Sequence, residues 1–295
     1  MLNHAAKTRR LTARRVALVA VSLAVVALLV TYAVTTRPSS TTTTTTTTTT
    51  KAQPSGQVLL NATFDDDRLD PAIWNTCHWW ADQGCTISSN EELEWYVPEQ
   101  VSVADGALRL TADPTPVRGS DGKSYDFRSG MVTTGPPPMD EHAPAKLAFT
   151  YGSVETRLRV PAGRGLWPAV WLLPASRESV PEIDLLEVIG QNPSEVLMHL
   201  HPKSRSAESP DKAYRVPGPS LAEDWHTLRL DWSANRLDFF VDGVRVWKLT
   251  GRQVPDEPMY VVLNLAVGGV YPGPPDQQTR FPATFAIDYL RITAA

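Results

Sequence analysis

Short apolar runs separated by Pro, Gly and Asp fill the sequence from residue 57 to its end. In ALRLTA (107–112) and ETRLRVP (155–161), apolar residues recur at every second position. A period of two is that of a β-strand with one buried face, whereas a helix repeats every 3.6 residues. About a dozen such runs, with no long amphipathic helix pattern between them, are typical of one large β domain. We therefore predict that residues 57–295 form an all-β domain, an antiparallel β-sandwich of the jelly-roll type.

An uncharged apolar stretch near the N-terminus predicts export. Residues 16–34 contain no charge, five Lys or Arg precede them, and Arg37 follows. This length suits a helix that crosses a bilayer, and the preceding bases keep the N-terminal side in the cytoplasm. We expect a basic cytoplasmic segment (1–15), a transmembrane signal anchor (16–35) and an extracellular domain on a single-pass protein of the cell membrane. The alternative is a cleaved signal peptide and a secreted domain.

Residues 36–56 differ in composition from both neighbouring segments. Ten consecutive Thr begin at Thr41, within a nearly pure run of hydroxyl residues. Such a segment cannot bury apolar surface, so we predict a disordered linker. It serves either as a stalk between membrane and domain or as a tolerated low-complexity tract.

The charge distribution argues against nucleic acid as the main partner. Residues 1–54 hold seven of the 28 bases and no acid, so the rest of the chain carries 21 bases against 32 acids. Binding to phosphates needs a concentrated basic stripe, and an acidic body offers none. Cys77 and Cys85 are the two cysteines of the chain. Because the domain is expected to be exported, we predict a local disulfide between them; a catalytic thiol would need a histidine signature, which is missing.

The densest group of acids inside an apolar stretch is Glu182-Ile183-Asp184-Leu185-Leu186-Glu187. On a regular strand Glu182 and Asp184 share one face and Glu187 lies on the other. A β-bulge of one residue would bring Glu187 back beside them. Crowded carboxyls separate their pKa values, which provides both a nucleophile and a proton donor, and two carboxyls about 5–5.5 Å apart cleave glycosides with retention. The alternatives are a solvated edge strand and a Ca²⁺ site made of acids.

Several blocks, in order along the chain, resemble glycoside hydrolase family 16, in its laminarinase-like (endo-β-1,3-glucanase) branch. The likeness covers about residues 58–293 and implies a concanavalin-like jelly roll with a concave substrate cleft. Besides EIDLLE itself, the matching blocks are NEELEWY (90–96), PAGRGLWPAVWLLP (161–174), DWHTLRLDW (224–232), LNLAVGG (263–269) and IDYLRI (287–292).

This resemblance implies a role for each acid of the cluster. Glu182 matches the nucleophile, Glu187 the general acid/base, and Asp184 the helper carboxylate beside the nucleophile. His201 matches a cleft histidine that follows the catalytic strand, near the leaving-group side. His199 and His201 could instead form a metal-binding pair or a buried hydrogen-bonded pair, because alternate positions of a strand share a face.

Aromatic platforms are expected because sugars stack their C–H faces on rings. By family position the substrate-binding residues are Asn90, Glu92, Trp95, Trp167, Trp171 and His201. Trp79 and Trp80, in the loop between the two cysteines, have no assigned place.

Two positions depart from the family pattern. Pro181 stands where Gly commonly precedes the nucleophile, with no Trp shortly upstream, and Met131 stands where many members carry Arg. One stacking platform is therefore missing or replaced. The family also implies a structural Ca²⁺ held by Asp288 and the backbone near Gly106, with an ordinary strand-end acid as the alternative at Asp288.

We expect a retaining hydrolase of β-1,3- or mixed β-1,3/1,4-glucan that works by double displacement. The chemistry needs no cofactor, and the expected partners are the polysaccharide and, through the N-terminal helix, the membrane; we expect a monomer. Two alternatives remain: a cell-surface transglycosylase, and a carbohydrate-binding module without catalysis, although such a module would be expected to lose one of the three acids.

Overall fold

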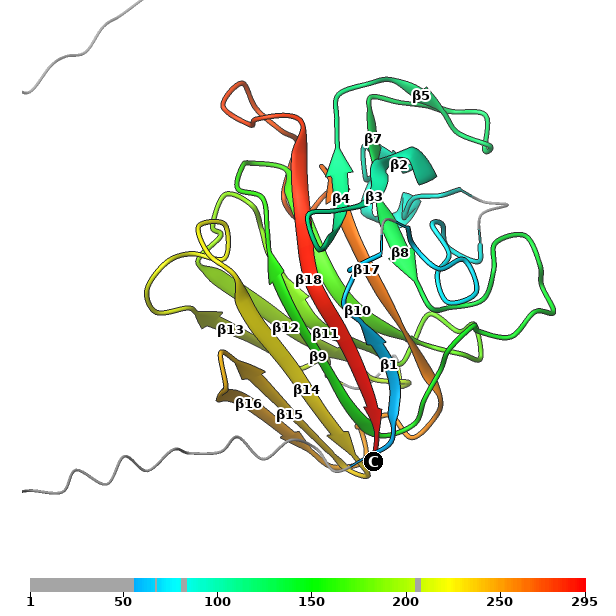
Figure 1. Ribbon diagram of the computed structural model, residues 1–295, viewed down its shortest axis with the longest axis vertical. Coiled ribbons are helices and arrows are strands. Elements are labelled where there is room, and N and C mark those ends of the chain that lie inside the picture. The colour runs from blue at the N-terminus through cyan, green and yellow to red at the C-terminus, as the bar shows by residue number, and fades with distance from the viewer. Residues whose placement is uncertain (1–55, 67, 81–83, 205–207) are drawn as a thin grey trace, which may run out of the picture. The chain divides into compact units, whose positions relative to one another are not determined.

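The computed structural model describes residues 56–66, 68–80, 84–204 and 208–295 (Figure 1). The predicted cytoplasmic segment, the membrane anchor and residues 36–55 of the linker lie outside the described residues. Two short 3₁₀ helices, η1 (Ser88–Asn90) and η2 (Pro98–Gln100), lie among the strands. In the part of the chain that is described, no helix is long and apolar enough to cross a membrane.

Most strands belong to two antiparallel sheets. The eight-stranded sheet has the order β16 (Val244–Thr250), β15 (Arg236–Val241), β14 (His226–Ser233), β9 (Gly152–Arg159), β18 (Ala283–Ala294), β4 (Ala107–Ala112) and β3 (Val101–Ala104), with β1 (Val58–Ala62) also paired to β18. The six-stranded sheet has the order β13 (Asp211–Arg215), β12 (Glu195–His201), β11 (Glu182–Glu187), β10 (Leu166–Pro174), β17 (Met259–Val267) and β8 (Met131–Thr133). Two small pairs complete the fold: β2 (Glu94–Tyr96) runs parallel to β7 (Phe127–Ser129), and β5 (Val117–Arg118) pairs with β6 (Ser124–Tyr125).

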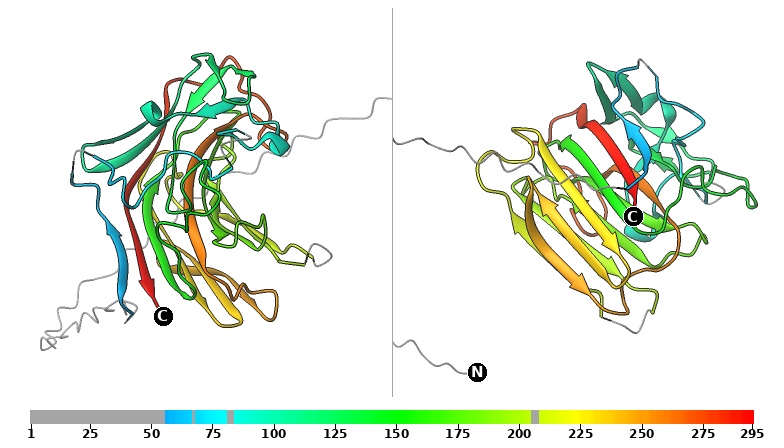
Figure 2. Two further views of the ribbon diagram at one scale, coloured as in Figure 1. Left: turned by 90° about the vertical axis from the view of Figure 1, so that its right-hand side faces the viewer. Right: turned by 60° about the horizontal axis from the view of Figure 1, so that its bottom comes forward.

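The two sheets pack face to face and curve together (Figure 2). Their facing sides follow the period of two in the sequence. In β12 the residues Val196, Met198 and Leu200 are fully buried in the shared core, while the intervening side chains face outward. In β14, Leu228 and Leu230 are buried in the same way. Full burial of each such side chain contributes about 1.5–3 kcal/mol, so the alternation predicted from sequence is what holds the sandwich together.

Strand β17 is buried on both faces, because a second apolar cluster covers its outer side. The cluster contains Tyr96, Met131, Ala169, Trp171, Leu173, Tyr260 and Val262. It lies on the outer face of the six-stranded sheet and supports one end of the cavity described below.

The ends of the domain meet at the edge of the eight-stranded sheet. Val58 pairs with Thr293, and the Ala294 amide donates to the Gln57 carbonyl at 2.8 Å. In Figure 1, β1 and the end of β18 lie side by side. The chain therefore enters and leaves this domain through the sheet opposite the one that carries the acidic strand β11.

Candidate active site

A β-bulge in β11 brings all three acids of EIDLLE to the same face. Trp171 of β10 pairs with Asp184, and the next residue toward the N-terminus of β10, Val170, pairs with Leu186, so Leu185 has no partner of its own. On the other side, Asp184 pairs with His199 and Glu187 with Leu197. Leu185 and Leu186 of β11 thus stand opposite Met198 alone of β12, and two residues opposite one define a bulge. The extra residue predicted from the sequence is present.

The outward face of the six-stranded sheet carries a cavity of about 880 Å³. Strands β10, β11, β12 and β17 form its floor, and its walls come from residues 86–90 and 92, Trp80, Ser179, Val180 and Tyr271. All three acids line it, together with Asn90, Glu92, Trp167, Trp171 and His201. The structure thus gathers these sequence-predicted residues around one space of the size that ligand sites occupy.

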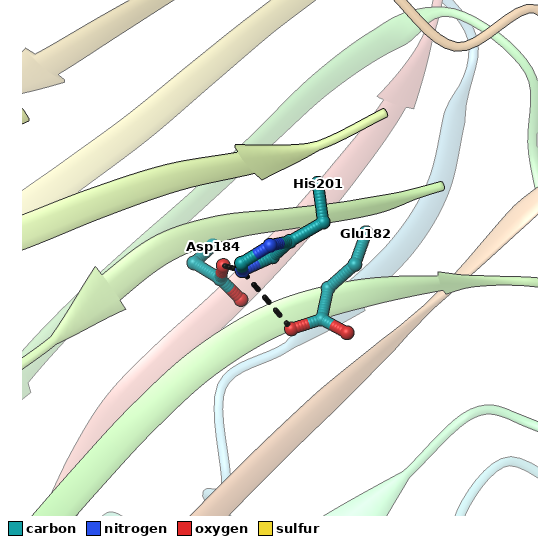
Figure 3. Close-up of side chains that lie close together, drawn as sticks. All are labelled: Glu182, Asp184 and His201. Atoms are coloured by element: carbon teal, nitrogen blue, oxygen red, sulfur yellow. Dashed lines mark ion pairs between the residues drawn. The ribbon is translucent and has the colours of Figure 1, made fainter. Parts of the chain in front are cut away.

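Each histidine of β12 lies against a different pair of acids. His201 Nε2 lies 3.4 Å from Asp184 Oδ2 and 3.8 Å from Glu182 Oε1 (Figure 3). His199 Nδ1 lies 2.5 Å from Glu187 Oε2. The family match had placed His201 near the leaving-group side, whereas His199 is the histidine that contacts Glu187. The two imidazoles thus contact different carboxylates, and these contacts do not join His199 and His201 as a metal-binding pair.

Burial and mutual repulsion raise the pKa values of two of the acids. Burial, followed by the charge of Asp184, raises the pKa of Glu182 well above its usual range. Burial, followed by the charge of Glu187, raises the pKa of Asp184 in the same way. Because both pKa values are raised, Glu182 and Asp184 share a retained proton and are not both ionised.

Glu187 is held at both of its carboxylate oxygens. Trp167 Nε1 donates to Oε1 at 3.0 Å, and His199 lies at Oε2. Trp167 itself packs edge-on against Tyr271, with ring centroids 5.5 Å apart. The indole therefore combines two tasks, orienting Glu187 and lining the cavity with an aromatic face.

A hydrogen-bonded chain under the floor fixes Trp171. Its Nε1 donates to Asn264 Oδ1 at 2.7 Å, and Asn264 Nδ2 donates to the Tyr96 hydroxyl at 3.0 Å. Asn264 was not among the residues predicted from sequence. The sequence did contain a signal for Asn264, since it is a single amide inside the apolar run LNLAVGG. A buried polar side chain in such a run is expected to have a hydrogen-bonding partner.

The loop closed by the disulfide supplies an aromatic wall. Cys77 and Cys85 are bonded, as predicted, with Cα atoms 5.4 Å apart. Within the loop, Trp80 lines the cavity, stacks on His78 at 4.1 Å and donates from Nε1 to the Thr86 carbonyl at 3.3 Å. Ser179 and Val180, from the segment in which the sequence lacks a tryptophan, line the same cavity as Trp80.

Trp95 lies apart from the cavity. Its side chain is 7% exposed and packs on Tyr125 at 5.0 Å, and a Cβ added to Gly119 would lie 2.5 Å from its ring. The indole thus fills the space between β2 and the β5–β6 hairpin. In this structure Trp95 is a packing residue and does not contact the space where we expect the sugar.

Two buried glutamates shape the wall that carries Asn90. Glu92 accepts from Asn90 Nδ2 at 2.8 Å and from the Ile87 amide at 3.1 Å. Glu94 is fully buried and accepts from the Val267 amide at 2.7 Å. Burial, then the charge of Glu92, raises the pKa of Glu94 well above its usual range. Burial raises the pKa of Glu92 as well, so the two carboxyls share a retained proton, which we place on Glu94.

We expect Glu94→Gln to make the fold less sensitive to alkaline pH. A group whose pKa is raised on folding stabilises fully below its unfolded pKa, and this stability is lost as pH rises toward the folded pKa, at up to about 1.4 kcal/mol per pH unit. Glutamine keeps a donor toward Glu92 and an acceptor for Val267 but does not titrate. Urea unfolding between pH 5 and 9 should give a flatter curve for Glu94→Gln than for the wild type. The exposed neighbour Glu91→Gln is the control; equal slopes for all three proteins would contradict the assignment.

A comparison with known proteins fits this geometry. The family model described as "Glycosyl hydrolases family 16" matches residues 141–291, half of the chain, including the acidic strand. The chain belongs to glycosyl hydrolases family 16. This confirms the family predicted from the sequence blocks.

Family 16 relatives align along most of the chain. The endo-1,3-1,4-beta-glycanase EglC of Rhizobium meliloti is 31% identical over 252 residues, which are 79% of this chain and 51% of that protein. Glucan endo-1,3-beta-glucosidase A1 of Niallia circulans is 30% identical over 78% of this chain and 36% of its own. The chain thus spans about half the length of the first of these curated relatives and about a third of the second.

Solved family 16 structures confirm the two-sheet jelly roll. The catalytic domain of an endo-1,3-beta-glucanase (laminarinase) from Thermotoga petrophila superposes with a TM-score of 0.72 at 32% identity, covering 81% of this chain and 98% of that one. The endo-beta-1,3-glucanase of Pyrococcus furiosus gives 0.72 at 27% identity, covering 81% and 94%.

The positions where this family 16 chain departs from the expected pattern have structural explanations. Met131 is fully buried in the second apolar cluster, so it replaces a polar contact with packing under the cavity floor. Arg177, upstream of Pro181, lies over the ring of Trp79 at 5.1 Å, so the segment before Glu182 packs on the disulfide-bonded loop.

At the calcium site expected from family 16, the carboxylate already has a partner. Asp288 accepts from Arg157 Nη1 at 2.7 Å, which gives the carboxylate a cationic side chain as its partner. Gly106 lies in the turn between β3 and β4, with φ of 69°. A Ca²⁺ site needs six to eight oxygen ligands, and the pair with Arg157 already occupies the one carboxylate. Calcium binding stays a prediction, and no step of the chemistry depends on it.

Proposed function

We propose that this chain is a retaining endo-β-glucanase that hydrolyses β-1,3- or mixed β-1,3/1,4-glucan. The observation that carries the proposal is the bulged strand, which presents Glu182, Asp184 and Glu187 on the floor of an aromatic-lined cavity. The linkage is supported by the names of the family 16 relatives, which are endo-1,3- and endo-1,3-1,4-glucanases. The activity and substrate of the whole protein are inferred from these.

In the first step Glu182 attacks the anomeric carbon. The bond from that carbon to the leaving oxygen breaks, its electron pair stays on the oxygen, and Glu187 supplies the proton that neutralises it. When the proton shared by the two acids lies on Asp184, Glu182 is the ionised nucleophile, and Asp184 can donate a hydrogen bond that orients it before attack. The product is a glycosyl ester on Glu182.

In the second step water replaces the ester. Glu187, now a carboxylate, takes a proton from the water, whose oxygen attacks the same carbon and releases Glu182. Two inversions at one carbon give net retention. Because Trp167 and His199 hold Glu187 in place, the same carboxyl can act as acid in one step and as base in the next.

The cavity walls fit a chain of sugar rings. Trp80, Trp167, Trp171 and Tyr271 offer rings for the C–H faces, and Asn90 with Glu92 offers polar groups for hydroxyls. The domain acts outside the cell, tethered to the membrane by residues 16–35; the apolar run and the bases before it support this location.

The test is sugar release by the full chain in mild detergent on laminarin, lichenan, agarose and xyloglucan. We expect reducing ends from laminarin or lichenan, an early fall in viscosity that marks internal cleavage, and a first-formed β-anomer in the NMR spectrum. The Glu182→Gln variant should release none. Tight binding without release would favour a binding module, products longer than the substrate would favour a transglycosylase, and an α-anomer would contradict retention.

A further inference from the structure

The two histidines of β12 contact different acids of the cluster. His199 and His201 lie on the same face with ring centroids 5.9 Å apart. His199 lies 2.5 Å from Glu187 Oε2, whereas His201 approaches Asp184 and Glu182 at 3.4 and 3.8 Å. Both side chains of the closer pair are largely buried, 20% exposed for His199 and 13% for Glu187. His199 is thus within proton-transfer reach of the proposed acid/base Glu187.

The surroundings of this pair are mostly negative or neutral. From β11 it faces Asp184, from β12 the other imidazole, and from β10 the uncharged Trp167. Tyr271 interacts with Glu187 from the far wall, and Asp211 of β13 stands opposite His199 in the register. Neighbouring carboxylates stabilise an imidazolium more than a second imidazole destabilises it.

The balance of effects on His199 favours its protonated form. Burial lowers the pKa of His199, but the contact with Glu187 and the charges of Glu187 and Asp184 raise it by more, so the net direction is upward. When two groups interact this closely, the proton belongs to the pair.

We propose that His199 is a positioning residue that stores the proton of the acid/base Glu187, holding it on the pair until the substrate arrives. This inference rests on the proposed function, because it assigns Glu187 the proton-transfer role. His201 lies on the nucleophile side and has no part in it.

The proton is returned to its starting position in each catalytic cycle, and no further reactant is needed. Before cleavage the proton moves from His199 Nδ1 to Glu187 Oε2, which leaves a neutral imidazole and a carboxylic acid. The acid then gives the proton to the leaving oxygen as the glycosidic bond breaks. In the second step Glu187 takes a proton from the attacking water and passes it back to Nδ1, so the pair is restored at the end of each cycle.

The test compares His199→Asn with His201→Asn, a matched control that removes the other imidazole, in the full chain. An asparagine amide can occupy the place of Nδ1 and donate to Glu187, but it cannot store a mobile proton. The readout is kcat/KM from pH 4 to 9 on a laminarin oligosaccharide, whose leaving group needs protonation, and on its dinitrophenyl glycoside, whose leaving group does not.

For His199→Asn we expect the alkaline limb of the kcat/KM profile with the oligosaccharide to move to lower pH by about one unit. At pH values above that limb, kcat/KM should be about tenfold lower than that of the wild type. The loss on the dinitrophenyl substrate should be several-fold smaller. His201→Asn should lower activity on both substrates equally and leave the alkaline limb in place.

An unchanged alkaline limb in His199→Asn, or a loss equal for both substrates, would overturn the proposal and leave His199 as a packing residue. The failure of the proposed function looks different: the Glu182→Gln variant would then be as active as the wild type, or the wild type would cleave neither substrate.

Discussion

Replacing Glu182 by alanine should abolish hydrolysis of laminarin or lichenan. Without the carboxylate no glycosyl ester forms, and we expect kcat/KM to fall by about 10⁴-fold, equivalent to about 5.4 kcal/mol of transition-state stabilisation. The fold should persist, because Glu182 lies at the first position of β11 with its side chain in the cavity. Reducing-sugar release and circular dichroism measure the two effects separately.

The same variant offers a stricter test with azide. Removal of the carboxylate leaves space below the anomeric carbon, which a small anion can enter. With a dinitrophenyl β-glycoside, azide should restore turnover of Glu182→Ala and yield the α-glycosyl azide, because one inversion replaces two. Glu178→Gln, an exposed acid four residues upstream, is the control and should keep full activity. A β-configured azide from Glu182→Ala would contradict the assignment of the nucleophile.

Replacing Glu187 by alanine should have the second-largest effect, and its size should depend on the leaving group. Loss of a general acid costs about 10²–10⁴-fold when the leaving oxygen needs a proton. With dinitrophenolate as leaving group the first step should survive, so the glycosyl ester on Glu182 accumulates. Intact-mass spectrometry should detect this adduct.

Azide distinguishes the two acids by stereochemistry. In Glu187→Ala it should attack the accumulated ester and give the β-glycosyl azide, the opposite configuration to that from Glu182→Ala. An α-azide here, or equal losses on the oligosaccharide and the dinitrophenyl glycoside, would show that Glu187 is not the acid/base.

The sequence predicted the structure well wherever the alternation of side chains between the two faces of a strand was sufficient. The period of two in β4 and β9 predicted which residues enter the core, because successive side chains of a strand point to opposite faces whatever their partners are. The same alternation predicted that the three acids of β11 share a face only if the strand contains one additional, bulged residue. Leu185 is that residue.

Register and the path of loops could not be read in this way. HLH at 199–201 shows that both histidines share a face, but which acid each meets depends on the pairing of Asp184 with His199 and of Glu187 with Leu197. Trp95 lies in a strand of three residues, all of them buried, so alternation could not show that its ring packs away from the cavity. Trp80 lines the cavity from the segment between the two bonded cysteines, where no periodic pattern predicts the position of a side chain.

The two ends of the domain meet on the sheet that does not line the cavity. The amide of Ala294 bonds to the carbonyl of Gln57, and the cavity lies on the outer face of the opposite sheet. A glucan is often far longer than the enzyme, and an attachment beside the cavity would obstruct a passing polymer. Here both ends of the domain, at Gln57 and Ala294, lie on the sheet opposite the cavity, so a strand of polysaccharide fixed in a wall or gel can lie across the cavity without meeting either of them.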